Sequence, residues 1–574
     1  MLDGTWDDRG DLKSLGATWQ PGYGWTYVGA SLPAALRPYL PAPYSWAAFN
    51  ERRLLRPNVT VGNATPDTST GTITLRPDQV EDVNTIVNAH RAGCPEFALA
   101  SLVGTGKTIT AIAAAKRLSG VRRILVVMPL GVMPAWRRSL RDMGDGGKEW
   151  VFLNYQSTKK LLDAPASAAA AKRQATKNRQ IASKGTPHTQ WDLVITDESH
   201  WLGNPESQQS RVVDRAIAGP KGQPAFVIRM SATLGNNPAQ LSYLHRGFAW
   251  RTGNPIKPSI TSEDYVAWCK TYGIGVEQSF GNKLTWASRS TPKAEARDIR
   301  KVRHLLFGGD PAWALRRVPN WPEPPRFLAP VELTPSERDA YDTEWALFKA
   351  AMSRVTSAER SHARIAATGD TSATRAAAHE LSELKRAGRA AGIRYQQKAG
   401  LLRASGTADL IENFVTKGVQ VGAYCQHIDV VEALRHNLEG KGLTVGTYTG
   451  RNTGTREDER VAFQRGATNV LLYTTAEGLN MHAGEKAVQG NNVPRVSIIA
   501  QPNWSPRLAA QAEGRAHRDG QIAPCYYAYA LNTIEERIMQ TLIPAMRTML
   551  AMMGDDTTSL EALSADLGIP LIGV

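Results

Sequence analysis

Residues 97–108 read Phe97-Ala98-Leu99-Ala100-Ser101-Leu102-Val103-Gly104-Thr105-Gly106-Lys107-Thr108. An apolar run long enough for one buried strand leads into two glycines, a lysine and a threonine, and residues 109–115 then have the composition of a helix. In nucleotide-binding α/β proteins a strand, a phosphate-binding loop and a helix follow one another in this order. The stretch therefore predicts a phosphate-binding loop within a parallel α/β fold.

The glycines and polar residues of this loop have separate expected roles. Gly104 and Gly106 allow a tight turn that presents backbone N–H groups to phosphate oxygens, at the positive end of the helix dipole. Lys107 would reach the terminal phosphates, and the Thr108 hydroxyl would hold Mg²⁺. Ser101 stands where the full motif has a glycine. For this stretch alone, a glycine-rich turn that binds no nucleotide is therefore the alternative.

The composition indicates several domains and a reducing compartment. A chain of 574 residues exceeds the size of one core. No apolar run approaches the ~20 residues of a membrane helix, and the acidic N-terminal stretch differs from a secretory signal. Four scattered cysteines without a C-x-x-C pair argue against structural zinc and against a disulfide framework: Cys94, Cys269, Cys425 and Cys525. We therefore expect a cytoplasmic protein.

The charge favours a polyanionic partner. Lys and Arg number 68 against 53 Asp and Glu, and the sequence pI is about 9.6. A merely basic enzyme is the alternative. Residues 157–190 carry seven basic side chains against a single acid. A solvated insertion and a phosphate-contacting one are equally consistent with this pattern.

The pattern of strands and helices divides the chain into five parts. Residues 1–70 are rich in Trp and Pro; here a short helix at 11–15 precedes a hairpin of residues 17–19 and 25–28. Their tryptophans serve either nucleic-acid binding or the module's own core. Alternating strands and helices at 71–255 and again at 401–550 predict two parallel sheets. Between them, residues 256–400 read as helical insertions with a proline-rich linker at 319–330, and 551–574 as a C-terminal tail.

Three polar motifs follow apolar strands. Asp197-Glu198-Ser199-His200 and Ser231-Ala232-Thr233 stand at strand ends, where ligands sit in open α/β sheets. Asp197 would organise Mg²⁺ and Glu198 would align and deprotonate the attacking water. His200, Ser231 and Thr233 would sense the γ-phosphate. In the second α/β region, Arg515 and Arg518 are expected on one face of a helix, where both would bring positive charge to that phosphate.

Taken together, these motifs resemble superfamily 2 helicases, most closely the Swi/Snf-type DNA translocase ATPases. The resemblance covers residues 72–545 and rests on motifs in a fixed order: Gln79, Gly104-Thr105-Gly106-Lys107-Thr108, Asp197-Glu198-Ser199-His200, Ser231-Ala232-Thr233 and Arg515-Ala516-His517-Arg518-Asp519-Gly520-Gln521. Further matches are Met128-Pro129-Leu130, Leu315-Arg316-Arg317, Thr475-Ala476-Glu477-Gly478-Leu479-Asn480 and Trp504-Ser505-Pro506. The implied fold is α/β, with two RecA-like parallel-sheet lobes, helical insertions between them and a small N-terminal α+β module.

The resemblance also assigns binding residues. Arg76, Gln79, Thr105 and Gln511 would join the phosphate loop in binding ATP, with Gln79 reading the adenine. Seven residues would line the DNA track: Pro129, Trp136, Thr449, Gly450, Thr474, Thr475 and Gly478. The sequence departs from the family at Ser101-Leu102, at Ser199 and at Ser231-Ala232-Thr233-Leu234, the last being closer to strand-separating helicases.

The expected function is that of a DNA-dependent ATPase using ATP and Mg²⁺, which moves on or remodels duplex or forked DNA. The expected setting is replication, recombination or repair in a bacterial or phage-infected cell, as a monomer, with proteins of those pathways as partners and no membrane contact. One alternative is a strand-separating DNA or RNA helicase. An alternative of another class is a non-hydrolysing nucleotide-gated clamp, which Lys107, Glu198, Arg515 and Arg518 disfavour.

Overall fold

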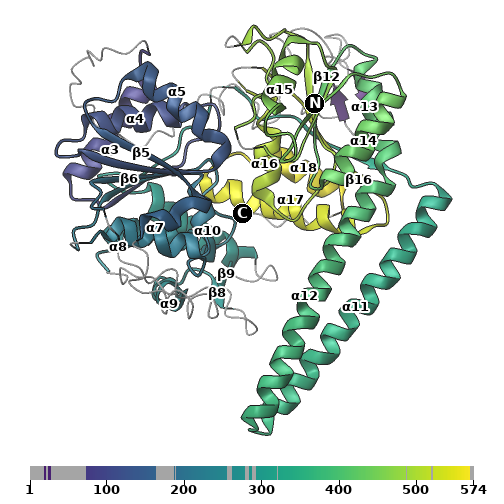
Figure 1. The fold of residues 1–574 in the computed structure, drawn as a ribbon, viewed down its shortest axis with the longest axis horizontal. Helices are drawn as coiled ribbons and strands as arrows, with labels where there is room; N and C mark the ends of the chain where they lie inside the picture. Colours follow the sequence, from purple (N-terminus) through teal and green to yellow (C-terminus); the bar gives the residue numbers. More distant parts are fainter. Residues whose placement is uncertain are drawn as a thin grey trace. The chain divides into compact units, whose positions relative to one another are not determined.

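The computed structural model describes most of the chain from residue 73 onward. The described residues are 73–162, 187, 189–220, 222–254, 262–277, 284–286, 292–319, 321–476, 478–485, 488–518 and 521–568, with two N-terminal strands. They form two compact units (Figure 1). The first unit comprises the described residues up to Pro322 and Thr548–Thr558, and the second Glu323–Arg547 and the described residues from Ser559. Among the described helices, none is long and apolar enough to cross a bilayer.

The first unit is built on a six-stranded parallel sheet in the order β10-β3-β7-β6-β4-β5. Its strands are β3 (Glu96–Leu99), β4 (Arg123–Met128), β5 (Glu149–Asn154), β6 (Leu193–Asp197), β7 (Phe226–Met230) and β10 (Ala314–Leu315). Its main helices are α3 (Pro77–Arg91), α4 (Lys107–Arg117), α5 (Met133–Met143), α7 (Gln208–Ala218), α8 (His245–Thr252), α9 (Ser262–Thr271) and α10 (Pro292–Phe307). Every residue of β3, β6 and β7 is buried, as in strands covered on both faces.

The second unit repeats this plan with the order β11-β16-β15-β12-β14-β13, again all parallel. Its strands are β11 (Arg326–Val331), β12 (Gln420–Tyr424), β13 (Val445–Tyr448), β14 (Val470–Tyr473), β15 (Arg495–Ile499) and β16 (Cys525–Ala530). Its helices are α13 (Ala404–Val415), α14 (Ile428–Gly440), α15 (Arg456–Arg465), α16 (Pro506–Glu513), α17 (Ile534–Met553) and α18 (Thr558–Asp566), of which α17 carries the chain back to the first unit. Each sheet has its own apolar core. The predicted α/β fold with two parallel-sheet lobes is confirmed.

Strand β11 corrects one prediction. Residues 319–330 were expected to be a linker because of their prolines, yet Arg326–Val331 pairs in parallel with β16 along its whole length. Pro330 lies within this strand, opposite Tyr529. Proline is tolerated there because β11 is an edge strand and has a neighbour on one side only.

A long helical hairpin follows β11 and precedes the other strands of the second sheet. Helices α11 (Pro335–Ala367) and α12 (Thr371–Leu402) have 33 and 32 residues, so each is about 50 Å long, and they run antiparallel (Figure 1). Stacked rings of Trp345, Phe348 and Tyr395 pack the hairpin near its base. Farther out, a Cβ on Gly388 would approach Val355 to 3.1 Å, so glycine permits close packing there. The helices expected between 351 and 395 are therefore parts of one hairpin.

At the N-terminal end, β1 (Thr18–Gln20) and β2 (Gly24–Thr26) pair antiparallel with Trp19 opposite Trp25. The predicted hairpin is therefore confirmed. The predicted helix at 11–15 and most of the basic segment at 157–190 lie outside the described residues.

Candidate functional site

Three polar segments of the first unit meet at one edge of its sheet. Strands β3, β7 and β6 are neighbours, and Met230 is in register with both Leu99 and Asp197. Because the strands are parallel, the residues that follow each of them emerge at the same edge. The phosphate loop, Glu198 and Ser231 therefore lie along the carboxyl edge of one sheet, as predicted.

The phosphate loop has the backbone expected of it. Gly104 and Gly106 have φ values of +89° and +80°, in a region of backbone conformation that residues other than glycine rarely adopt. A Cβ on Gly106 would also lie 2.4 Å from Nε2 of Gln79. Helix α4 begins directly after Gly106 with no side-chain cap. The first N–H groups of any helix have no partner within the helix, and this end of α4 suits an anion.

The Lys107 ammonium group is hydrogen-bonded to the phosphate loop. Nζ donates to the carbonyl oxygens of Ser101, at 2.7 Å, and Leu102, at 3.1 Å. Thr108 is half-buried at the second position of α4. Both residues therefore stand at the start of the helix, where the predicted roles toward phosphate and metal require them.

Arg76 and Gln79 adjoin this loop. Nη2 of Arg76 donates to the carbonyl of Thr105 at 2.6 Å, and the Arg76 backbone N–H donates to Oε1 of Gln79 at 3.0 Å. Gln79 is buried and close to Gly106. Gln79, which was predicted to read the adenine, and Arg76 thus adjoin the loop predicted to hold the phosphates.

Arg316 and Arg317 make hydrogen bonds at the carboxyl edge of the first sheet that the sequence did not reveal. Nη1 of Arg316 donates to the carbonyl of Ala232 at 2.7 Å and also contacts that of Ala100. Arg317 donates from its backbone to Oγ of Ser101 and from Nε to the Asp82 carboxylate at 2.6 Å. Burial raises the pKa of Asp82 to about 6, against the lowering effect of Arg317. The only sequence signal was the match of residues 315–317 to the family.

Hydrogen bonds fix the carboxylate of Asp197, and Glu198 has an uncommon backbone conformation. Oδ2 of Asp197 accepts a hydrogen bond from Nε1 of Trp136 at 2.7 Å, and Oδ1 accepts one from the Glu198 backbone at 2.9 Å. Burial raises the pKa of Asp197, whereas the Trp136 bond and the positive charge of Lys107 lower it. Glu198 has φ 49° and ψ 51°, a left-handed conformation that is uncommon outside glycine and tends to occur at functional sites.

The predicted coupling residues form a chain of contacts. Nδ1 of His200 lies 3.3 Å from Oε2 of Glu198 and 2.9 Å from Oγ of Ser231. The Ser231 hydroxyl donates to the carbonyl of Thr233 at 2.7 Å, which leaves its oxygen to accept from Nδ1 of His200 in the tautomer that carries a proton there. The acidic motif and the Ser231-Ala232-Thr233 motif are therefore physically linked.

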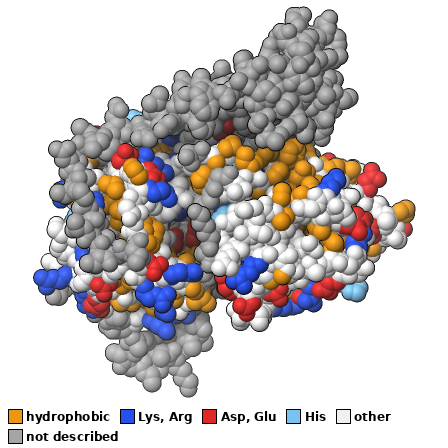
Figure 2. Space-filling model, turned by 90° about the horizontal axis from the view of Figure 1, so that it is seen from above, with side chains coloured by type: hydrophobic (Ala, Val, Ile, Leu, Met, Phe, Trp, Pro, Cys, Tyr) orange, Lys and Arg blue, Asp and Glu red, His pale blue; other side chains and the backbone are white. Residues whose placement is uncertain are grey.

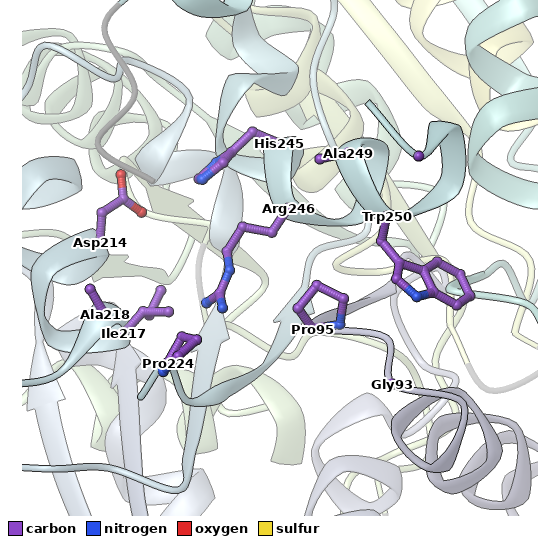
Figure 3. Close-up of a pocket in the computed structure, with 11 residues that line it drawn as sticks. Gly93, Pro95, Asp214, Ile217, Ala218, Pro224, His245, Arg246, Ala249 and Trp250 are labelled. Atoms are coloured by element: carbon purple, nitrogen blue, oxygen red, sulfur yellow. The ribbon is translucent and has the colours of Figure 1, made fainter. Parts of the chain in front are cut away.

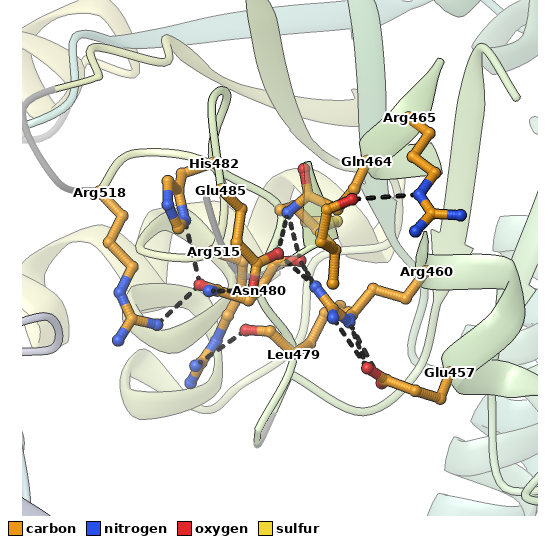
Figure 4. A network of polar contacts seen from close by, with 12 residues as sticks. Glu457, Arg460, Gln464, Arg465, Leu479, Asn480, His482, Glu485, Arg515 and Arg518 are labelled. Atoms are coloured by element: carbon orange, nitrogen blue, oxygen red, sulfur yellow. Dashed lines mark hydrogen bonds and ion pairs between the residues drawn. The ribbon is translucent and has the colours of Figure 1, made fainter. Parts of the chain in front are cut away.

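The second unit holds the two predicted arginine fingers, but not on a helix. Helix α16 ends at Glu513, so Arg515 lies in the turn that follows and Arg518 in an isolated bridge with Gln521. The prediction of a shared helical face was wrong because Gly514 ends the helix. Nη1 of Arg515 donates to the carbonyl of Leu479 at 3.3 Å, and Nη1 of Arg518 donates to Oδ1 of Asn480 at 2.8 Å (Figure 4).

Gln511 lies on α16 and is buried. Among the described residues neither of its amide atoms has a hydrogen-bond partner. A buried amide without a partner is costly and points to a missing ligand or water. This is consistent with the predicted contact to nucleotide.

The residues predicted for the DNA track fall into two groups. Thr474 and Thr475 are partly exposed, and Gly450 and Gly478 are exposed. Pro129, Trp136 and Thr449 are buried, which contradicts a direct contact in this structure. Trp136 is only 1% exposed because its indole packs in the core and binds Asp197. Thr449 is also buried, and both its hydroxyl and its backbone N–H donate to Oδ1 of Asn452.

A cavity of about 640 Å³ lies at the other edge of the first sheet (Figure 3). It is lined by Pro95 and Pro224, which precede β3 and β7, and by Asp214, His245 and Arg246. Burial and nearby arginines lower the pKa of His245 to about 3, so its ring is neutral. No predicted site residue lines this cavity. The candidate site is therefore the carboxyl edge and not this cavity.

Comparison with known proteins finds a family match for part of the first unit. Residues 72–236 match the family described as "Type III restriction enzyme, res subunit". Among solved structures, the chain is similar to the Sulfolobus solfataricus SWI2/SNF2 ATPase core in complex with dsDNA, at 15% sequence identity, over 88% of this chain and 98% of that chain, with a TM-score of 0.32. No curated protein matches the chain significantly. The family match spans the phosphate loop, the acidic motif and the Ser231-Ala232-Thr233 motif.

Proposed function

We propose that the chain is a DNA-dependent ATPase of the Swi/Snf type, a superfamily 2 motor that translocates on or remodels DNA, and the family match of residues 72–236 supports this. The observation that carries the proposal is the contact chain from Glu198 through His200 to Ser231. It joins the expected catalytic base to the motif that follows the neighbouring strand. A protein that only binds nucleotide does not require such a link. A motor does, because hydrolysis of the γ-phosphate must change the conformation of other parts of the protein.

The residues of the first unit fit ATP with Mg²⁺. The glycine backbone and the uncapped start of α4 suit phosphate oxygens, and Lys107 can leave its two loop carbonyls to meet them. Thr108 and Asp197 would hold the metal. Bound ATP would supply the γ-phosphoryl group, and the metal would neutralise its charge. Glu198 would orient and deprotonate water.

The second unit would complete the reaction. Arg515 and Arg518 would bring positive charge to the γ-phosphate, an effect worth roughly 10³–10⁵ in rate in enzymes that use arginine fingers. Gln511 would meet the same nucleotide through its unpartnered amide. Binding and hydrolysis would then alternate between two arrangements of the units and move two DNA grips relative to each other.

DNA is the expected partner of the chain, in the cytoplasm of a bacterial or phage-infected cell. The excess of 15 positive charges favours binding to a polyanion, which should weaken steeply with salt. On the face shown in Figure 2, basic and acidic side chains of the described residues are interspersed. We place the DNA contacts at Thr474, Thr475, Gly450 and Gly478, which are exposed or partly exposed.

The proposal predicts that duplex or forked DNA stimulates ATP hydrolysis more than single-stranded DNA or RNA does. Steady-state hydrolysis measured with each nucleic acid, and with none, tests this directly. The Lys107→Ala variant supplies the background rate. Stimulation mainly by single strands or RNA would instead favour a strand-separating helicase, the second candidate, which the Ser231-Ala232-Thr233 motif supports.

The Trp136→Phe substitution is expected to weaken the response to Mg²⁺. It keeps most of the buried ring and removes the N–H that orients and stabilises the Asp197 carboxylate. Loss of such an outer partner typically costs about 10–100-fold in metal affinity. The Mg²⁺ concentration giving half-maximal hydrolysis should rise by roughly 10-fold or more.

Trp150→Phe is the matched control, because the indole N–H of Trp150 donates only to the carbonyl of Asp145 among the contacts described. Its Mg²⁺ midpoint should stay at the wild-type value. An unchanged midpoint in Trp136→Phe would mean that Trp136 serves packing alone.

A further inference from the structure

The loop of residues 478–485 holds both predicted arginine fingers of the second unit. The carbonyl of Leu479 accepts from Nη1 of Arg515, and the Met481 backbone N–H donates to the carbonyl of Arg515 at 2.9 Å. Arg518 is held differently, through the side chain of Asn480. The position of the Arg518 guanidinium therefore depends on how the Asn480 amide is oriented.

That orientation is fixed by a carboxylate. Nδ2 of Asn480 donates to Oε1 of Glu485 at 3.1 Å (Figure 4). A carboxylate can only accept, so the amide nitrogen must face Glu485 and the amide oxygen must face Arg518. An inverted amide would place two acceptors together on one side and two donors together on the other. Glu485 therefore favours the orientation of Asn480 that holds the arginine. The amide oxygen of Asn480 also lies 3.2 Å from Nδ1 of His482.

Glu485 is in turn held by helix α15. Nε2 of Gln464 donates to Oε2 of Glu485 at 2.7 Å, and Nη1 of Arg460 pairs with the same oxygen. Gln464 and Arg460 also donate to the backbone carbonyl of Asn480, at 3.0 and 3.3 Å. The side chains of Glu485 and Arg460 are only 12% and 7% exposed. Such sheltered charge-assisted contacts are stronger than those in water.

We propose that Asn480 and Glu485 are positioning residues for Arg518, which hold its guanidinium ready for the γ-phosphate. This inference rests on the proposed function, in which Arg518 acts as an arginine finger. A free arginine side chain can adopt many rotamers, and it loses that entropy when it is fixed. If contacts already fix the Arg518 side chain before the nucleotide binds, this entropy is not lost during the reaction.

The expected effect of Asn480→Ala is on turnover and not on ATP binding. A misplacement of about 1 Å in a catalytic arrangement can cost roughly 100-fold in rate. We expect kcat for ATP to fall by roughly 10- to 100-fold while KM for ATP changes by less than about twofold. Glu485→Gln, which can still bond to Asn480 but loses the charge opposite Arg460, should show a smaller loss of kcat with the same unchanged KM.

A double-mutant cycle separates positioning from general stability. Kinetics and thermal stability are measured for the full chain with Asn480→Ala, Arg518→Ala and both together. If Asn480 acts through Arg518, its substitution costs no further kcat once Arg518 is gone. Equal losses of kcat with and without Arg518 would overturn the inference. Should Asn480→Ala fail to fold, Glu485→Gln combined with Arg518→Ala gives the same test.

Glu457→Gln is the matched control. Glu457 also binds Arg460, but its side chain is 62% exposed and it makes no hydrogen bond to Asn480 or Glu485 among the described contacts. Its kcat should stay within twofold of wild type. If Arg518→Ala alone leaves kcat unchanged while DNA still stimulates hydrolysis, the proposed function stands and the positioning role is overturned. If DNA never stimulates hydrolysis, the proposed function itself has failed.

Discussion

The Lys107→Ala variant is expected to hydrolyse no ATP above background, with or without DNA. The ammonium group of Lys107 is the only side-chain charge expected on the terminal phosphates from the first unit. In the structure Nζ of Lys107 already donates hydrogen bonds to the loop carbonyls of Ser101 and Leu102. Loss of one preorganised electrostatic contact to a transition state costs roughly 10²–10³ in kcat. Weaker nucleotide binding should add to that loss.

Lys116→Ala serves as the control for this variant. Lys116 lies on the same helix, and its Nζ donates to the carbonyl of Met143 at 2.7 Å, away from the loop. It should hydrolyse ATP within about twofold of wild type. If Lys107→Ala retained more than about a tenth of wild-type turnover while Lys116→Ala behaved normally, the glycine-rich turn would not be the catalytic phosphate site.

The central strands were predictable because their signal is local. Runs such as Ile124–Met128 and Leu193–Ile195 are apolar throughout, as buried parallel strands must be. The apolar residues of the edge strands β5 and β11 lie beside polar ones, Glu149 and Asn154 in β5 and Arg326 in β11, and β11 also contains Pro330. Such residues are tolerated because one side of an edge strand has no partner. Their pairing depends on a neighbour far along the chain. The sequence pattern therefore revealed the middle of each sheet better than its edges.

The site was predictable to a different degree in each unit. In the first unit the phosphate loop, the acidic motif and the Ser231-Ala232-Thr233 motif each follow a strand of one parallel sheet, so strand order alone brings His200 to Ser231. In the second unit Gly514 ends α16 early, and the loop around Asn480 decides where Arg518 lies. Spacing along a sequence does not encode such loop contacts. For the same reason the indole of Trp136, which the family pattern placed on DNA, was found on Asp197.

Glu198→Gln is expected to bind ATP and fail to turn it over. Gln keeps the size of the side chain and removes the base, and general base catalysis contributes typically 10²–10⁴ in rate. The left-handed backbone of Glu198 directs the carboxylate so that it lies against His200, at the edge where the phosphate loop ends. Single-turnover hydrolysis and binding of a fluorescent nucleotide would be measured on the same preparation. We expect kcat to fall by roughly 10²–10⁴ with the nucleotide Kd within a few-fold of wild type.

Glu206→Gln is the control for the loss of a nearby carboxylate, because Glu206 pairs at the surface with Arg211 and should leave both quantities unchanged. The comparison also tests the contact chain to Ser231. A neutral amide at residue 198 keeps the size of the side chain and its contact with Nδ1 of His200, so the link between the two motifs should survive while the base is lost. Glu198→Gln should therefore respond to ATP with the same DNA-binding change as wild type and then stay in that state. If it lost that response together with turnover, the charge of Glu198 would be needed for coupling as well as for chemistry.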